Sequence, residues 1–357
     1  MPEKGIRTFF FGKRRKVKQL KSPFVYKSVT DNFKDNKSPL AFIKHCDYYS
    51  IFDEESLTCV GRNTSRGKQL AKHRLYKYIN SFLDSSEVLG LWQFQNNCWF
   101  NSLLMCLFFS DNLRVIMNSL RLRWISSSST NKNKVKLYNI FTYMMEIPHY
   151  NKDIINTIDS NMILSLLHKF QPTMFDHPGY DGGSGILYCK KLLRFLGLKD
   201  YMEIRLISLE KQRLIYVELN DNAIAKLNDD ITYTDLLKYI VSLIKNFNGT
   251  IKILALYIDI KPSFVIPIKI HNMTLESMYV SNYKSNNGID KHAVAGIICN
   301  KQMCLYDGER AALNKTLKQY DWKNENSKSF AMTYNTTSNM IFNFSKSNRV
   351  AFFVTKQ

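Results

Sequence analysis

Residues 90–102, with the sequence GLWQFQNNCWFNS, form the most informative stretch of the chain. Its cysteine, Cys98, follows Asn96 and Asn97 and begins an apolar run with helical spacing that extends to Phe109. Polar residues before such a run cap helices, so the stretch predicts a helix that starts near Cys98. Backbone N–H groups at a helix N-terminus favour a thiolate. Cys98 is therefore the candidate nucleophile; the alternative is an ordinary buried cysteine.

A nucleophilic cysteine needs an imidazole base and a group that orients the imidazole, and the chain has seven histidines. His292 is followed by two strand-like runs, 293–299 and 303–306, that a short turn joins. Asp307 ends the second run, and a hairpin of this length can bring its carboxylate beside the imidazole. Taken singly, His292 is more simply a surface histidine and Asp307 a turn residue. Their order after Cys98 favours a catalytic interpretation.

The two segments resemble the motifs of ubiquitin-specific proteases, a family of papain-like cysteine peptidases. The family's cysteine motif reads G-L-x-N-x-G-N-T-C-[YF]-[MF]-N-[SA], and its histidine motif reads G-H-Y-x-A-Y followed by W-Y-x-F-D-D. The cysteine motif is matched directly at Gly90, Leu91, Asn96, Cys98, Asn101 and Ser102. The resemblance implies a triad of Cys98, His292 and Asp307 that cleaves ubiquitin or a ubiquitin-like protein from conjugates. It also suggests a divergent member of the type found in large DNA viruses.

The cysteine motif is not matched throughout. Gln95 and Asn97 replace its glycine and threonine, and Gln93 occupies the position of the asparagine that forms the oxyanion hole. Glutamine serves this purpose in papain-like enzymes, so Gln93 is the candidate oxyanion donor. Between the two motifs, the segment 179–185 contains four glycines and precedes a predicted helix; a tight turn is favoured over a phosphate-binding loop there.

Hydrophobic periodicity predicts a helical half followed by a β half, which is an α+β arrangement. The resemblance implies a papain-like fold in which helices carry Cys98 and an antiparallel β half carries His292 and Asp307. We expect a basic N-terminal extension over residues 1–87 and a catalytic domain over 88–357. The predicted helices are 68–82, 98–109, 135–145, 154–170, 186–196 and 233–247. The predicted strands are 204–209, 214–219, 251–258, 264–270, 293–299, 303–306, 330–334, 340–344 and 350–354.

The net charge of +20 predicts a polyanionic partner such as nucleic acid. Residues 1–87 hold 18 Lys and Arg against 9 Asp and Glu, and 13–18 form a basic block. That block is equally well a solvated arm, a nuclear-import signal or a nucleic-acid contact. No apolar run reaches membrane-spanning length and no secretory signal is recognisable, so we expect no membrane association and an intracellular protein, in the host cytoplasm or the virion if it is viral.

The seven cysteines form no C-x-x-C pair, which gives a zinc site no support, and no cofactor is expected. In an intracellular setting they are expected to be free thiols, mostly buried. Transglutaminase-like proteins and bacterial cell-wall peptidases share the order Cys, His, Asp but place the histidine much closer to the cysteine. Here 194 positions separate Cys98 from His292, which suits a ubiquitin-protease arrangement better. The alternative functions are a basic virion or nucleic-acid-associated protein that keeps a peptidase fold, and a processing protease for a viral protein.

Overall fold

The computed structural model describes most of the chain from residue 46 onward. The described residues are 46, 49–53, 55–56, 58–78, 90–91, 93, 97–127, 129–146, 158–175, 185–209, 213–260, 263–282, 284–285, 292–308, 317–325, 328–335 and 338–355. The helices among them are α2 (Ser65–Tyr78), α3 (Cys98–Phe109), α4 (Asp111–Ile125), α5 (Lys132–Glu146), α6 (Ser160–Phe170), α7 (Gly185–Leu196) and α8 (Tyr233–Lys245).

A sheet of ten strands, in the order β12-β11-β10-β8-β15-β6-β3-β4-β5 with β7 on β8, organises the β half. Two smaller sheets are β1-β2 and β13-β14-β9. The strands are β1 (Ser50–Asp53), β2 (Thr58–Gly61), β3 (Tyr201–Leu209), β4 (Leu214–Leu219), β5 (Asn222–Asn228), β6 (Ile253–Asp259), β7 (Lys269–Ile270), β8 (Met273–Ser281), β9 (Lys284–Ser285), β10 (Ala293–Cys299), β11 (Gln302–Tyr306), β12 (Lys318–Gln319), β13 (Ser329–Asn335), β14 (Ser338–Asn343) and β15 (Arg349–Thr355).

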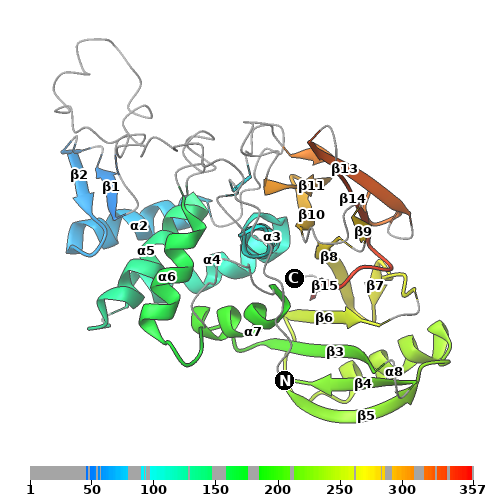
Figure 1. The fold of residues 1–357 in the computed structure, drawn as a ribbon. Helices are drawn as coiled ribbons and strands as arrows, with labels where there is room; N and C mark the ends of the chain where they lie inside the picture. Colours follow the sequence, from blue (N-terminus) through cyan, green and yellow to red (C-terminus); the bar gives the residue numbers. More distant parts are fainter. Residues whose placement is uncertain are drawn as a thin grey trace, which may run out of the picture.

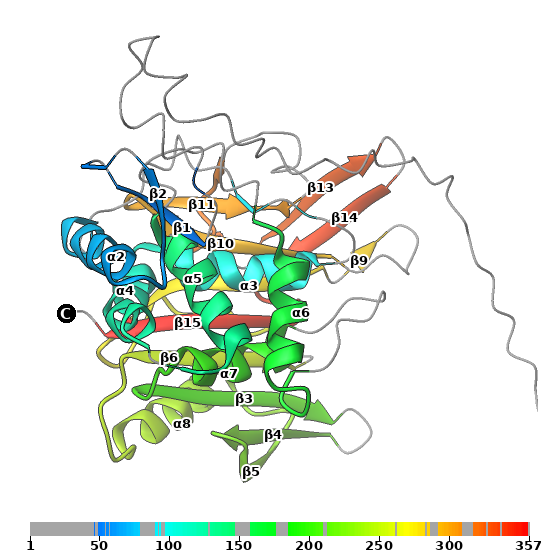
Figure 2. The ribbon, with the colours of Figure 1, turned by 90° about the vertical axis from the view of Figure 1, so that its left-hand side faces the viewer.

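Helices α3 to α7 lie on one side of the large sheet, with α3 between the strands and helices α4 and α5, whereas α8 packs on the other side (Figure 1). Every residue of α3 is buried, because the helix lies against β10 and β8 on one side and helices α4, α5 and α7 on the other. Figure 2, seen from the helical side, shows α5 and α6 in front of this central helix. An apolar helix without a polar face is stable only in such an enclosed position.

The central strands are apolar on both faces because a separate hydrophobic core packs against each face of the sheet. Successive side chains of a strand point to opposite faces. In β15, Val350 and Phe352 join the core beneath the helices, whereas Ala351 and Phe353 join a second core on the other face. Helix α8 and the small sheet containing β14 complete that second core. Such two-sided burial explains the continuous apolar runs that predicted these strands.

The predicted α+β fold is confirmed, with the helices first and most strands after them. Strand β4 agrees with its predicted range at both ends, and so does β10. The sheet is antiparallel apart from one pair, since β3 and β6 run parallel. The helix predicted over 154–170 begins at Ser160 in the described residues, because the Asp159 side chain accepts a hydrogen bond from the Asn161 N–H and caps the helix there.

The strand predicted over 264–270 is wrong except for its last two residues, which form β7. Backbone groups of Phe264 are bonded outside any sheet. Its N–H donates to the Ser345 carbonyl at 3.1 Å, and its carbonyl accepts from the buried Arg349 guanidinium at 2.8 Å. Phe264, Ile266 and Ile270 are buried, whereas Val265 and Ile268 are exposed. This alternation is the pattern of a strand, although the backbone of Phe264 is bonded to Ser345 and Arg349 instead.

The described part of the N-terminal region packs against the helices. Arg62, after β2, donates to Glu146 at the end of α5, and Arg121 of α4 donates to the other carboxylate oxygen, both at 2.7 Å. Ile51 and Leu75 bury their side chains against Ile125 of α4. The predicted domain boundary at residue 87 lies outside the described residues, as does the basic block 13–18.

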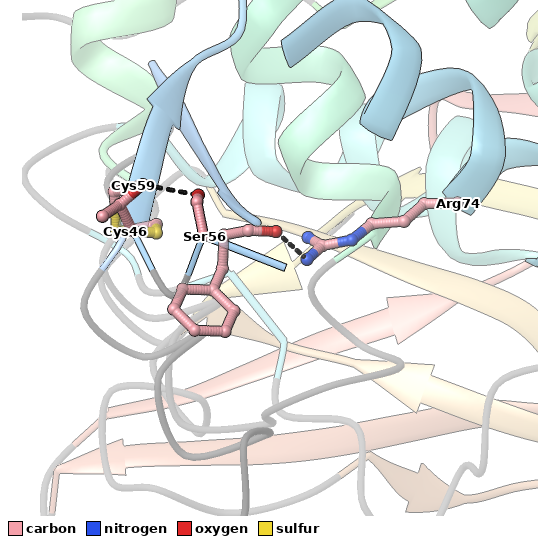
Figure 3. Close-up of a disulfide and its surroundings, with 6 residues drawn as sticks. Cys46, Ser56, Cys59 and Arg74 are labelled. Carbon is pink, nitrogen blue, oxygen red and sulfur yellow. Dashed lines mark hydrogen bonds between the residues drawn. A yellow bond between two sulfur atoms is a disulfide. The ribbon is translucent and has the colours of Figure 1, made fainter. Parts of the chain in front are cut away.

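The expectation of free thiols is wrong for one pair, because Cys46 and Cys59 form a disulfide beside the β1–β2 hairpin (Figure 3). The remaining five cysteines form no disulfide and are buried. The two strands hold Cys59 in a fixed register, with Phe52 opposite it. Sequence spacing alone gave no reason to pair these two cysteines, since the hairpin that positions Cys59 was not predicted.

Among the described residues, no single helix is long and apolar enough to cross a membrane; α3 and α4 reach that length only together, across a bend of 81°.

Candidate active site

Cys98 is the first residue of α3, as its polar neighbours predicted, and is 7% exposed. The carbonyl of Asn97 accepts the N–H groups of Phe100 and Asn101, each at 3.0 Å, which starts the helix. The Asn97 side chain makes no capping bond and instead donates to the hydroxyl of Ser160 on α6 at 2.6 Å. The start of α3 is thus fixed to a second helix, and the Cys98 sulfur lies where the helix dipole favours negative charge.

A serine near the start of α3 fixes the helix to the strand that follows His292. The hydroxyl of Ser102 donates to the carbonyl of Ala293 at 3.0 Å, and both residues are buried. Ala293 is the first residue of β10, so His292 directly precedes the strand. This bond sets the distance between the cysteine helix and the histidine strand.

The side chains of His292 and Asp307 are in direct contact. The imidazole Nε2 lies 2.9 Å from Oδ1 of Asp307, and the two side chains are 3% and 2% exposed. The hairpin brings them together because β10 and β11 pair with Ala295 opposite Tyr306, which leaves both residues just beyond the same end. The predicted juxtaposition of these two side chains is therefore present.

The contacts of the imidazole raise the pKa of His292 to about 10. Burial by itself lowers this pKa, but hydrogen bonds to Asp307 and to the Cys98 thiol outweigh it. Because Nε2 faces Asp307, Nδ1 is the ring nitrogen left for the sulfur of Cys98. An imidazolium held between a carboxylate and a sulfur is placed to stabilise negative charge that develops on that sulfur.

Gln93, the candidate oxyanion donor, lies beside the residue that follows Asp307. Its backbone N–H donates to the carbonyl of Gly308 at 3.2 Å. Its side chain is partly buried, and the Oε1 atom is fully buried without a hydrogen-bond partner in the described part of the chain. The structure therefore brings Gln93 beside Gly308, the residue that follows Asp307, and its role as oxyanion donor stays a prediction. Its neighbours Gln95 and Asn96 lie outside the described residues.

Asn282 is a site residue that sequence reasoning missed. Its side-chain Oδ1 accepts the N–H of His292 at 2.6 Å, and its own N–H donates to the His292 carbonyl at 2.9 Å. It holds the histidine backbone from both sides, directly after the end of β8. The only signal for it would have been the pairing of β8 with β10, and β8 itself was not predicted.

Helix α7 approaches the cysteine closely through Gly185, its first residue. A Cβ atom there would lie 2.8 Å from the Tyr279 ring and 3.2 Å from the carbonyl of Trp99, so only glycine fits. The N–H of Gly185 is also bonded to the Tyr279 hydroxyl, although burial raises the pKa of that phenol. Of the glycine-rich segment 179–185, Gly185 alone is described; the tight turn predicted for the rest lies outside the described residues.

No group of three or more His, Cys, Asp or Glu side chains among the described residues is placed to hold a metal ion. The side chains that the structure brings together here supply a thiol, an imidazole and a carboxylate, and Gln93 supplies a side-chain amide beside Gly308. Such a set can perform acyl transfer by nucleophilic catalysis.

No protein-family model matches the sequence, and no curated protein matches it significantly. Among solved structures, it is similar to a chain of the SAGA Ubp8/Sgf11/Sus1/Sgf73 DUB module bound to ubiquitin aldehyde, with 10% identity over 86% of this chain and 79% of that one and a TM-score of 0.46. An essential yeast splicing factor gives 10% identity over 86% and 83% and a TM-score of 0.42. The Saccharomyces cerevisiae apo Pan2 pseudoubiquitin hydrolase–RNA exonuclease module gives 11% over 76% and 54%, at 0.38. These likenesses are distant, and the site is interpreted below from its own geometry.

Proposed function

We propose that this protein is a cysteine-type hydrolase that releases ubiquitin or a ubiquitin-like protein from conjugates. The observation that carries the proposal is the His292 imidazole, which is buried between the Asp307 carboxylate and the Cys98 thiol at the start of α3. A buried ion pair of this kind costs desolvation energy, so it is weak evidence for a purely stabilising role. Perturbed groups that share a proton are typical of catalytic sites.

The proposed reaction has two steps. The Cys98 thiolate attacks the carbonyl carbon of the scissile amide, and the amine leaves with the proton that the His292 imidazolium supplies. A thioester then joins Cys98 to the acyl group. Neutral His292 next takes a proton from water, the hydroxide attacks the thioester, and the thiolate leaves. Asp307 holds the imidazole in the required orientation throughout.

In each step a tetrahedral intermediate carries a negative oxygen. The backbone N–H of Cys98 and the amide of Gln93 are the proposed donors to that oxygen. Donors that are in place before charge develops lower the barrier without further rearrangement.

The substrate class rests on the motif resemblance in residues 90–102 and on its continuation at His292 and Asp307. A processing protease for another protein would use the same chemistry, so the substrate is decided by experiment.

Hydrolysis of fluorogenic conjugates tests the proposal. The full chain is assayed against ubiquitin and ubiquitin-like proteins that carry a C-terminal fluorogenic amide. We expect turnover by the wild type and none by Cys98→Ala. Cys106→Ala is the matched control, because it makes the same change at a fully buried position of the same helix. Turnover that survives in Cys98→Ala, or a wild type inactive on every conjugate, overturns the proposal.

A further inference from the structure

The end of β11 is joined to the segment that precedes the cysteine helix. The hydroxyl of Tyr306 donates to the carbonyl of Leu91 at 2.5 Å, and the N–H of Gln93 donates to the carbonyl of Gly308 at 3.2 Å. Between Tyr306 and Gly308 lies Asp307, which contacts His292. Two hydrogen bonds, one on either side of the acid, therefore attach the segment 306–308 to Leu91 and Gln93.

Tyr306 is placed to act as the central part of this connection. It is 1% exposed, and its hydroxyl also interacts with the Asn101 side chain on α3. Burial raises the pKa of this phenol well above its usual value, so the hydroxyl stays protonated and donates. A buried hydroxyl can hold a segment in one position only when its hydrogen-bond partner is itself held in place. Leu91 meets this condition because it is fully buried.

Gly308 provides the space that Gln93 occupies. A Cβ atom at position 308 would lie 2.9 Å from the Cβ of Gln93 and 3.2 Å from its Oε1. The Gln93 side chain thus packs directly on the backbone that follows the acid. The family motifs quoted above have Asn, Phe and Asp at the positions of Gln93, Tyr306 and Gly308. These three departures lie together in the structure, because both Gln93 and the Tyr306 hydroxyl lie against Gly308.

We propose that Tyr306 is a positioning residue that couples the Asp307–His292 pair to the Gln93 segment. Its hydroxyl holds Leu91 against the end of β11, and Gly308 holds Gln93 two residues further on. The positions of Asp307, which orients the base, and of Gln93, the proposed oxyanion donor, are thereby fixed relative to each other. The kinetic effect expected of Tyr306 rests on the proposed function, whereas the structural connection through Tyr306 does not.

The kinetic test uses Tyr306→Phe in the full chain, which removes one oxygen and keeps the ring. Loss of this bond should lower kcat about tenfold with KM unchanged, the size of one hydrogen bond. Tyr306→Phe combined with Gln93→Ala should be no slower than Gln93→Ala alone, since the tyrosine acts through Gln93. The pH profile should keep its shape, because the His292–Asp307 contact is untouched. Tyr257→Phe, which removes a buried hydroxyl from β6, is the matched control and should keep full activity.

Hydrogen exchange provides a readout that needs no substrate. In Tyr306→Phe, amides 91–97 should exchange faster, whereas those of β10 and the global stability stay as in the wild type. Faster exchange with an inactive wild type would support the coupling while the proposed function fails. Unchanged exchange of 91–97, or additive losses in the double variant, would overturn the inference whatever the substrate.

Discussion

The Nε2 atom of His292 lies 2.9 Å from Oδ1 of Asp307 in a contact that is almost completely buried. Fifteen positions separate the two residues in sequence, and the β10–β11 hairpin returns the second beside the first. The burial matters as much as the distance. A carboxylate screened from water acts on the imidazole at low effective dielectric, and this supports a pKa of about 10 for His292.

Removing the charge of Asp307 should change how activity depends on pH. Asp307→Asn keeps a hydrogen-bonding side chain but lowers the pKa of His292, because burial of the imidazolium is then less compensated. The active thiolate–imidazolium pair persists only below the pKa of His292, so the basic limb of the kcat/KM profile should move to lower pH by about 1 unit or more. Asp321→Asn, in the turn after β12, is the control. If the basic limb of the Asp307→Asn profile stays where it is in the wild type, Asp307 does not control the pKa of the catalytic base.

Replacing Gln93 should affect turnover rather than binding. Gln93→Ala should lower kcat roughly a hundredfold, the usual effect of one lost oxyanion donor, and leave KM little changed. Steady-state kinetics on a fluorogenic ubiquitin conjugate measure both constants. Gln302→Ala, at the far turn of the β10–β11 hairpin, should be neutral. If turnover of Gln93→Ala equals that of the wild type, the oxyanion donor is another group.

Helix α3 and the β10–β11 hairpin were predictable because each combines a continuous apolar run with residues that mark where the element begins or ends. Polar residues before Cys98 and the turn after Cys299 mark the ends of the elements, and the burial of both faces explains the lack of alternation. The α+β order followed from the same runs. These are the parts of the fold whose local and tertiary preferences agree.

Two of the elements that were not predicted, α4 and β8, bury polar side chains. Helix α4 turns Arg114 and Arg121 inward, where they bond a backbone carbonyl and Glu146, so its pattern does not read as an apolar stripe. Strand β8 carries Glu276, fully enclosed and bonded by the Ser110 hydroxyl and by Asn112. Long-range partners such as these are invisible in the sequence. For the same reason Asn282, which holds His292 from the end of β8, could not be predicted.

The disulfide should contribute to stability without contributing to catalysis. It closes a loop of 13 positions, which in the chain-entropy description is worth roughly 3 kcal/mol. The double variant Cys46→Ser, Cys59→Ser should therefore unfold at lower urea concentration than the oxidised wild type, with kcat/KM unchanged. Wild type under reducing conditions should match the variant. Equal stability of the oxidised wild type and the variant would contradict this contribution.

The basic block at residues 13–18 should bind nucleic acid without sequence preference. Binding through several Lys and Arg weakens steeply with salt, because each neutralised phosphate releases counterions. Deletion of residues 1–22 should lower retention of nucleic acid and flatten its salt dependence, and should leave cleavage of a small substrate intact. Unchanged retention of nucleic acid after the deletion would mean that the binding surface lies elsewhere in the chain. Loss of cleavage would mean that residues 1–22 are needed for the fold.

Covalent capture tests the central proposal most directly. The full chain is incubated with ubiquitin that carries a C-terminal electrophile, and the products are analysed by intact mass and peptide mapping. We expect one ubiquitin per chain, attached to Cys98, with the same adduct in Cys106→Ala and none in Cys98→Ala. An adduct on any other cysteine, or a wild type that forms none with ubiquitin or ubiquitin-like probes, would contradict the assignment of Cys98 as the nucleophile of a ubiquitin-processing hydrolase.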